Sequence, residues 1–262
     1  MAEMPRMPET VLITGASSGI GLELARLFAA DKCDLVLVAR RADRLEALAK
    51  ELEAAHGIRA RAIAKDLADP AAPAQLAEAL HNRGAALDVL VNNAGFGALG
   101  HFARLDERRQ LEMVQLNVAA LTHLTRLFLP GMVERRRGGI LNVASTAAFQ
   151  PGPLMSVYYA TKAYVLSLTE GLAEELRGTG VVASCLCPGP TFTEFLVRAE
   201  MKQSAAFEAA AMSAARVARV GYRGFRKGRV VVVPGFGNRM GTLLVRAVPR
   251  WLARKATFYL NK

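Results

Sequence analysis

The sequence predicts an α/β fold in which helices cover both faces of a doubly wound parallel sheet. From Thr10 onward, short apolar and β-branched runs alternate with longer segments of helical spacing, the pattern of strands and crossover helices. Most strand candidates are apolar throughout, as expected of strands buried on both faces. The chain has 262 residues, of which 52% are hydrophobic. This is enough for one large core, and we expect a single domain.

The candidate elements follow one another in a regular order. Strands are expected at residues 11–14, 35–39, 60–65, 89–92, 140–144, 181–185 and 230–233. Between them, apolar residues recur every three or four positions, which predicts helices at 19–30, 42–55, 74–82, across 106–136, and at 156–177 and 213–225. Right-handed crossovers make the doubly wound sheet the simplest topology, with ligands outside the carboxyl ends of the strands.

Charge is distributed unevenly along the chain. The net charge is +11, but residues 216–262 hold 12 Lys and Arg and no acid, so nucleic acid, a membrane surface or an acidic partner is expected there if anywhere. The composition is too apolar for a disordered chain. Three cysteines are too few for a disulfide framework, and the first ten residues lack the apolar core of a signal peptide. Both features predict a reducing, cytoplasmic compartment.

A glycine-rich loop joins the first expected strand to the first expected helix. It reads Thr14-Gly15-Ala16-Ser17-Ser18-Gly19-Ile20-Gly21. Glycines let the backbone turn sharply, and the unpaired N–H groups of a helix N-terminus attract an anion such as a phosphate. The loop lacks the lysine of a nucleoside triphosphatase P-loop. A glycine-rich turn without a ligand is the alternative.

Six motifs occur in a fixed order along the chain. They are TGASSGIG at 14–21, NNAG at 92–95, Asn117, Ser145, Tyr158-x-x-x-Lys162 and Pro188-Gly189. Together they resemble the NAD(P)-dependent short-chain dehydrogenase/reductase family over about residues 10–234. The resemblance implies a single-domain Rossmann-type fold. It also implies cofactor contacts at Gly15, Ser17, Ser18, Gly19, Ile20 and Gly21, and at Asn93, Ala94 and Gly95 after the fourth strand.

The residues after the second strand predict which nicotinamide cofactor binds. A carboxylate there would bind the adenosine ribose 2′-hydroxyl of NAD, but the sequence has Ala39 followed by Arg40 and Arg41. A guanidinium offers donors suited to phosphate, so we expect NADP(H) to be preferred over NAD(H). The alternative is that the arginines only begin a solvated helix. By resemblance, Asp66 and Leu67 would contact the adenine, although Asp66 also suits an ordinary turn.

Tyr158 and Lys162 are candidates for acid–base chemistry. They are four residues apart in an expected helix, so their side chains share one face. A neighbouring ammonium should lower the pKa of the phenol from its ordinary value of about 10, as proton exchange with a carbonyl or alcohol requires. Spacing alone does not exclude Tyr159, which lies three residues from Lys162; the family motif selects Tyr158.

The resemblance assigns roles to further residues. Ser145 matches the serine that orients the substrate, with Thr146 as a neighbouring alternative, and Asn117 matches the asparagine that holds a water in the proton relay. The implied reaction is hydride transfer between the nicotinamide and a carbonyl carbon. In this reaction Tyr158 donates the proton, Ser145 hydrogen-bonds the oxygen and Lys162 binds the nicotinamide ribose.

Two segments complete the expected site. Pro188, Gly189 and Thr191 resemble the segment that contacts the nicotinamide end, although Pro and Gly also make ordinary turns. Residues 190–212 stand where the family has a lid over its substrate. They carry the apolar side chains Phe192, Phe195, Leu196, Met201, Phe207 and Met212. An apolar lid predicts a small hydrophobic carbonyl or alcohol substrate, such as a ketosteroid, a fatty acyl derivative or an aromatic ketone.

Metal chemistry is not expected. The four histidines are scattered without ligand spacing. Cys185 and Cys187 fall on one face of an apolar strand and are expected to be buried thiols rather than a redox pair.

The expected organisation is an N-terminal extension (1–9), a catalytic domain (10–237) with its lid, and a basic amphipathic tail (238–262) that Pro249 splits into two short helices. The tail is too charged to span a bilayer. Peripheral contact with an anionic membrane is one expectation for it, and packing on its own domain or a sister subunit is another. Helices 106–136 and 156–177 are expected to pair with their copies in a homodimer or homotetramer, as in the family. Nucleic acid is not an expected partner.

The leading interpretation is an NADP-dependent oxidoreductase. The alternative is a cofactor-binding, membrane-peripheral regulatory or scaffold protein without significant turnover. A pure binding module has no need of the complete set of Ser145, Tyr158, Lys162 and Asn117, which favours the enzyme.

Overall fold

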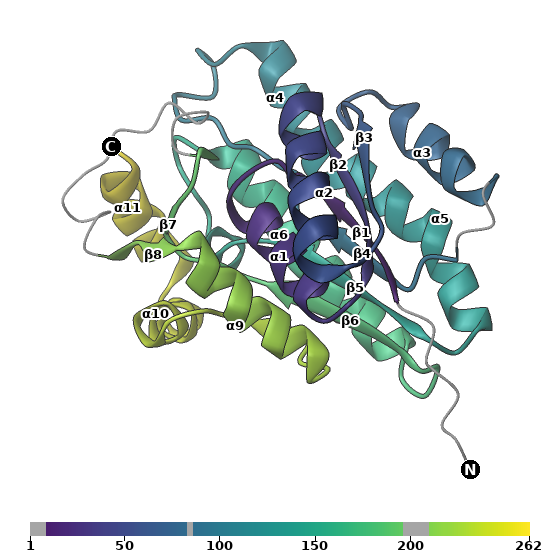
Figure 1. Cartoon of the computed structure of the whole chain (residues 1–262). Coiled ribbons are helices and arrows are strands. Elements are labelled where there is room, and N and C mark those ends of the chain that lie inside the picture. Colours follow the sequence, from purple (N-terminus) through teal and green to yellow (C-terminus); the bar gives the residue numbers. More distant parts are fainter. Residues whose placement is uncertain (1–8, 83–85, 196–209) are drawn as a thin grey trace.

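A seven-stranded parallel sheet with helices on both faces forms the body of the molecule (Figure 1). The structure is a computed structural model that describes residues 9–82, 86–195 and 210–262. The strand order is β3-β2-β1-β4-β5-β6-β9, and each neighbouring pair is parallel. The order reverses between β1 and β4, the place where a doubly wound sheet opens a crevice at its carboxyl edge. The predicted fold class is confirmed.

The elements lie within about two residues of the expected bounds. The strands of this sheet are β1 (Thr10–Thr14), β2 (Asp34–Ala39), β3 (Ala60–Ala64), β4 (Val89–Asn92), β5 (Gly138–Val143), β6 (Val181–Leu186) and β9 (Val231–Val232). The helices are α1 (Gly19–Ala30), α2 (Ala42–His56), α3 (Ala72–His81), α4 (Glu107–Val114), α5 (Leu121–Glu134), α6 (Ser156–Glu175), α9 (Ala214–Arg226), α10 (Phe236–Ala247) and α11 (Arg250–Asn261).

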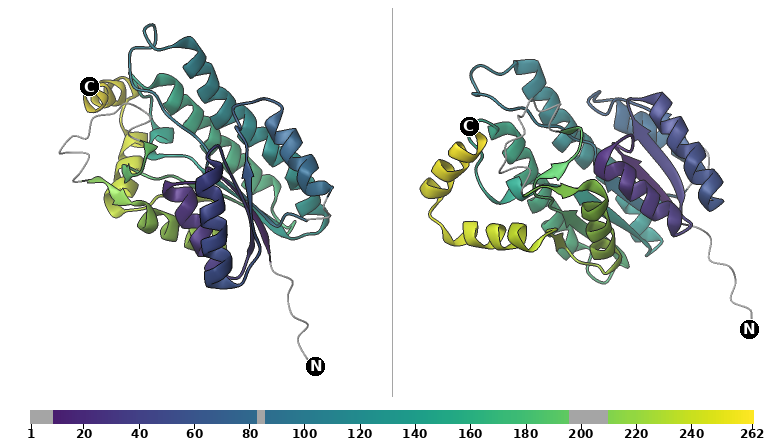
Figure 2. Two further views of the ribbon diagram at one scale, coloured as in Figure 1. Left: turned by 45° about the horizontal axis from the view of Figure 1, so that its top comes forward. Right: turned by 60° about the vertical axis from the view of Figure 1, so that its left-hand side comes forward.

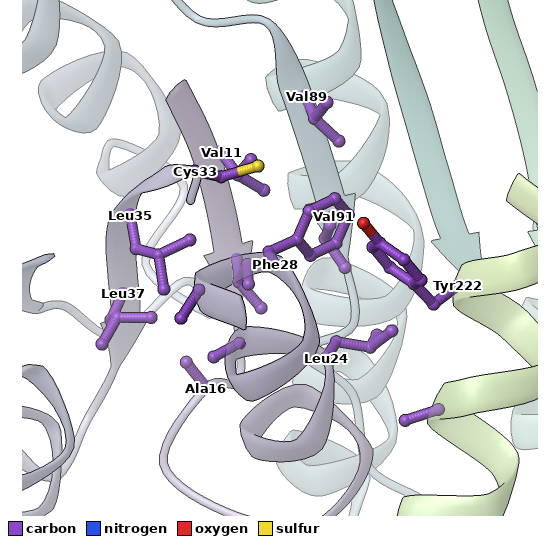
Figure 3. Packing of buried hydrophobic residues seen from close by; sticks show 14 of the residues in the cluster. Val11, Ala16, Leu24, Phe28, Cys33, Leu35, Leu37, Val89, Val91 and Tyr222 are labelled. Atoms are coloured by element: carbon purple, nitrogen blue, oxygen red, sulfur yellow. The ribbon is translucent and has the colours of Figure 1, made fainter. Parts of the chain in front are cut away.

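Two apolar layers hold the helices on the sheet. On one face, side chains of α1, α2 and α9 pack against β1, β2 and β4. Figure 3 shows Phe28 of α1 beside Val91 of β4 and Tyr222 of α9, and the edge-to-face rings of Phe28 and Tyr222 are 4.9 Å apart. On the other face, α3 and α5 cover the sheet through residues such as Leu76 and Leu124. Burial on both faces explains the apolar strands.

The long helical segment is not one regular helix. Between α4 and α5 the backbone forms a π-helical turn, η1 (Gln115–Ala120). Such a turn inserts an extra residue and rotates the side chains around it, frequently at functional sites. Here it brings Asn117, which is only 1% exposed, to the inside of the molecule.

A second, two-stranded sheet was not predicted. It joins β7 (Thr191–Phe192) to β8 (Met212–Ser213) in parallel. This pairing ties together the two ends of the predicted lid, 190–212. The lid residues Leu196, Met201 and Phe207 lie outside the described residues.

The C-terminal segment forms two helices, α10 and α11, separated at Pro249 as predicted. Figures 1 and 2 show them at one end of the molecule beyond α9, far from α3. Thr242, Ala253 and Thr257 are buried, so both helices pack on the body through one side. Within the described parts of the chain, no helix is long and apolar enough to cross a membrane.

Candidate active site

A cleft of about 910 Å³ opens at the carboxyl edge of the sheet. Nearly all of the site residues predicted from the sequence line it. These are Gly15, Ser17, Ser18, Gly19, Ile20, Arg40, Arg41, Asp66, Leu67, Asn93, Ala94, Gly95, Ser145, Tyr158, Lys162, Pro188, Gly189 and Thr191. Gly21 and Asn117 are not part of the lining and lie behind it.

The glycine loop makes the sharp turn that its sequence predicts. Gly15 and Gly19 have φ of +67° and +58°, a region that residues with a Cβ rarely adopt. Gly21 has a packing role, because a Cβ there would lie 2.5 Å from the carbonyl oxygen of Gly15. Ser18, the N-cap of α1, makes no side-chain hydrogen bond to the helix. The N–H groups of the first turn therefore suit the pyrophosphate of a dinucleotide.

Thr14 and Asn93 join the ends of β1 and β4 at the switch point. The Asn93 amide donates to the carbonyl oxygens of Thr14 (2.9 Å) and Gly15 (3.2 Å), and the Thr14 hydroxyl oxygen accepts from the backbone N–H groups of Asn93 and Ala94. The loop is thus held against the NNAG segment. Asn92 is buried instead in a network with Thr125 and Asn142.

The arginines after β2 differ in how they enter the site. Arg41 donates to the Ser17 hydroxyl at 3.1 Å and its side chain is 27% exposed. Arg40 is 62% exposed and lies 3.8 Å from Asp66. Arg44, one helical turn further along α2, pairs with Glu194, as does Arg41. Glu194 was missed because it lies 150 residues away from Arg44 in the chain.

Tyr158, Lys162 and Ser145 meet at the other end of the cleft. The Lys162 Nζ lies 5.8 Å from the centre of the Tyr158 ring and donates to the carbonyl oxygen of Val143 at 2.9 Å. Ser145 hydrogen-bonds with Tyr158 and donates weakly, at 3.4 Å, to the carbonyl oxygen of Pro188. The alternative Tyr159 also lines the cleft, but its hydroxyl donates to Asn261 of α11.

Burial dominates the acid–base properties of this pair. It raises the pKa of Tyr158 to about 12, against the lowering effect of the hydrogen bond from Ser145. It also lowers the pKa of Lys162 to about 8, because the ammonium is removed from water. The lowered pKa of Tyr158 expected from the sequence is wrong for this structure. Both side chains are at least nine-tenths buried, so desolvation outweighs the effect of a cation that lies 5.8 Å from the ring centre.

Asn117 supports the site from behind. Its side chain pairs with both backbone groups of Phe96, accepting at 3.1 Å and donating at 2.9 Å, and it donates to the Thr161 hydroxyl on α6. A Cβ at Gly95 would lie 2.9 Å from Asn117 Oδ1. Gly95 therefore separates Asn117 from the open cleft.

The substrate end of the cleft is apolar. The Phe195 ring lies 5.2 Å from the Tyr158 ring, and the walls include Phe96, Leu99, Met155 and Leu260. Leu260 comes from the end of α11, where Asn261 donates to the carbonyl oxygen of Pro153. Sequence reasoning missed this wall, because nothing in the tail's helical pattern indicates where its last turn docks.

The buried cysteines and the acidic and histidine side chains form no metal site in the described residues. Cys185 and Cys187 are buried free thiols with sulfurs 3.7 Å apart.

This fold and site define a nicotinamide-dinucleotide-binding protein, and the sequence comparisons agree. A family model described as short chain dehydrogenase matches residues 9–204, and the chain belongs to that family. The ketoacyl reductase HetN of Nostoc sp. is 38% identical over 181 residues, which are 69% of this chain and 63% of that protein. The matched region thus spans less than two thirds of that relative's length.

Solved structures give the same result over nearly the whole chain. A short-chain dehydrogenase from Sphingobium yanoikuyae in complex with NADPH is 36% identical, with a TM-score of 0.82 and coverage of 92% of this chain and 93% of that one. A bulky-bulky ketone specific alcohol dehydrogenase from Comamonas testosteroni is 30% identical, with a TM-score of 0.78 and 92% coverage of both chains. A family member from Burkholderia phymatum, 27% identical with a TM-score of 0.81 and coverage of 92% of this chain and 94% of that one, is in complex with NAD.

Proposed function

We propose that the protein is an NADP-dependent oxidoreductase that interconverts a carbonyl and a secondary alcohol on a small hydrophobic substrate. The observation that carries this proposal is the meeting of Ser145, Tyr158 and Lys162 at the apolar end of a cleft whose other end holds the glycine loop and Arg41. A scaffold without turnover is not favoured, since it has no use for that arrangement.

Each residue has a role in the proposed reaction. The nicotinamide supplies or accepts the hydride when bound. Tyr158 gives its hydroxyl proton to the carbonyl oxygen during reduction and takes it back during oxidation. Ser145 donates a hydrogen bond to the same oxygen and orients it. Lys162 holds the nicotinamide ribose and keeps a positive charge next to the phenol, where it favours the phenolate left by proton transfer.

The preference for NADP(H) is proposed from the chemistry around Arg41. Its guanidinium and that of Arg44 form a positively charged pair at the start of α2, and no carboxylate follows β2 directly. A 2′-phosphate suits such a pair better than a ribose hydroxyl does. The NADPH complex of the Sphingobium relative supports this choice, while the NAD complex of the Burkholderia relative makes a direct test necessary.

The hydrophobic substrate is proposed from the lining of the cleft near Tyr158. Phe96, Leu99, Met155 and Phe195 pack with Tyr158, and Leu260 also lines the cleft. Apolar walls favour apolar ligands. The Comamonas alcohol dehydrogenase, which is specific for bulky-bulky ketones, supports a carbonyl substrate with sizeable groups.

We also propose that two parts of the chain have different functions. Residues 10–237 make the catalytic domain, and residues 238–262 make a basic tail that rests on an anionic membrane surface from the cytoplasmic side. The apolar side chains that α10 and α11 leave exposed, among them Leu243, Leu244 and Trp251, favour this role. Assembly into a homodimer or homotetramer would use α4, α5 and α6, where Leu111, Leu127 and Tyr164 are exposed.

The test is an absorbance assay of purified protein with NADPH and a panel of hydrophobic ketones, compared with Tyr158→Phe. We expect oxidation of NADPH by wild type and a loss of about 10²-fold or more in the variant, because the ring is kept and only the proton donor is removed. NADPH affinity, measured by nicotinamide fluorescence, should stay unchanged. Full turnover by Tyr158→Phe would contradict the assignment.

A further inference from the structure

Three consecutive side chains after β7 contact three separate parts of the cleft. Thr193 lies over the glycine loop, since a Cβ at Gly19 would be 3.1 Å from Thr193 Cγ2. Phe195 packs on the ring of Tyr158. Glu194, between them, pairs with the arginines of α2. The residues on both sides of Glu194 are therefore anchored, which fixes the direction of its side chain.

The ion pairs of Glu194 are short and involve both carboxylate oxygens. Oε2 lies 2.8 Å from Arg41 Nη1, and Oε1 lies 2.5 Å from Arg44 Nη1. Partial burial raises the pKa of Glu194, but the hydrogen bonds and charges of Arg44 and Arg41 outweigh this effect and lower it below its ordinary value. Glu194 is therefore ionised at neutral pH and occupies donors of both guanidinium groups.

We propose that Glu194 is a cofactor-selectivity residue: its carboxylate occupies the Arg41 and Arg44 donors that the 2′-phosphate of NADP(H) needs. The inference rests on the proposed function, which assigns the 2′-phosphate to these arginines. Binding of NADP(H) must then break the two ion pairs, whereas NAD(H), which has a hydroxyl at that position, leaves them intact. The carboxylate narrows the preference for NADP(H) that the arginines alone would give.

The Glu194 carboxylate also affects how the two arginines bind phosphate ligands other than NADP(H). An arginine pair without a carboxylate would attract other phosphates as well, including nucleotides with a 2′- or 3′-phosphate. The Glu194 carboxylate cancels part of the charge of the two arginines until a ligand with enough other contacts displaces it. The glycine loop and the Tyr158 end supply such contacts to a complete dinucleotide only.

The experiment measures the affinity of the full-length protein for NADPH, NADH and adenosine 2′-monophosphate by titration calorimetry. Glu194→Gln keeps the size of the side chain and removes its charge. Glu194→Asp keeps the charge and shortens the reach by one methylene. Glu51→Gln is the matched control, because Glu51 makes a comparable 3.1 Å ion pair with Arg26 away from the cleft.

We expect Glu194→Gln to bind NADPH and adenosine 2′-monophosphate about three- to tenfold more tightly, the range for releasing two partly exposed ion pairs. NADH affinity should be unchanged. Glu194→Asp, whose carboxylate no longer reaches both arginines, should show the same direction of change, and Glu51→Gln should behave like wild type. Thermal unfolding of each variant shows whether it is folded.

Three results would overturn the inference: unchanged NADPH affinity in Glu194→Gln, an equal gain for NADPH and NADH, or weaker NADPH binding, which would mean that Glu194 orients the arginines. Arg41→Ala separates this failure from failure of the proposed function. If Arg41→Ala weakens NADPH selectively while Glu194→Gln changes nothing, only the role of Glu194 is wrong. If Arg41→Ala leaves both cofactors unaffected, the arginine site and the inference both fail.

Discussion

Lys162 is a buried cation whose nearest polar partner is a neutral carbonyl oxygen. Because burial lowers its pKa from 10.5 to about 8, the folded protein binds fewer protons than the unfolded chain between these two pH values. The free energy of unfolding therefore rises with pH across this window. Tyr158 acts in the opposite direction only above pH 10, since its pKa is raised from 10.0 to about 12. At neutral pH Tyr158 is un-ionised and carries no such cost, so it is the buried ammonium of Lys162 that lowers stability there, as expected of a functional site.

Lys162→Met tests this cost directly. The rise in unfolding free energy between pH 8 and pH 10 should be smaller in the variant than in wild type, by about 2 kcal/mol, because two pH units of a single proton difference amount to that order. Urea unfolding at several pH values measures it. Lys50→Met, which removes an exposed lysine of α2, should keep the wild-type slope. Parallel slopes for wild type and Lys162→Met would mean that the buried ammonium titrates normally.

The sequence predicted the position of most site residues but not their burial or their pKa values. Most of the motif residues line one cleft, because the loops that carry them follow strands whose carboxyl ends lie at the same edge, while Tyr158 and Lys162 reach it from α6. The motifs could not rank Arg40 against Arg41, whose difference in burial depends on the contact with Ser17. They also gave the wrong direction for the Tyr158 pKa, since spacing along a helix reports neighbours but not desolvation.

The π-helical turn η1 is the element on which the back of the site depends. It rotates Asn117 inward, where one side chain satisfies both backbone groups of Phe96 and ties them to Thr161 of α6. Periodicity predicted a helix across this segment but not the extra residue, because a single π turn shifts the apolar pattern too little to detect. The β7–β8 pairing was missed for a similar reason, as two-residue strands carry no alternation.

Asn117→Ala should destabilise the fold by about 2–4 kcal/mol, because it removes the three hydrogen bonds of a buried amide, two with the backbone of Phe96 and one with Thr161. Chemical denaturation measures the loss. Gln115→Ala, in the same π turn but half-buried, is the control and should cost less than about 1 kcal/mol. Equal effects of the two substitutions would show that the turn tolerates loss of the Phe96 contacts.

The molecule as a whole is asymmetric in charge and in exposed apolar surface. On α10 the exposed Phe236, Met240, Leu243 and Leu244 recur at helical spacing, so they form one apolar face. Residues 236–262, which include both C-terminal helices, contain six Lys and Arg and no acid. The end of α11 also lines the substrate end of the cleft. A membrane or protein that binds the exposed apolar face of the tail would therefore lie close to the substrate end of the cleft.

We expect full-length protein to sediment with anionic phospholipid vesicles at low salt and much less with neutral ones. The Lys and Arg side chains of the tail are attracted to anionic headgroups, and the apolar face of α10 inserts among the lipids. Added salt should weaken binding by screening the charges. The double substitution Leu243→Ser and Leu244→Ser keeps every charge and should still abolish most of the binding. Leu111→Ser, at an exposed site on α4, should not.

These variants also separate the membrane from other partners of the tail. If the double variant still binds anionic vesicles, the binding depends on the net charge of +11 and not on the apolar face of α10. A loss of mass in light scattering by the double variant, with vesicle binding unchanged, would make the tail an interface between copies of the chain. Substitution is preferable to deletion here, because Thr242 and Thr257 are buried and Asn261 holds Tyr159. Removing the tail would therefore disturb the cleft and the surface together.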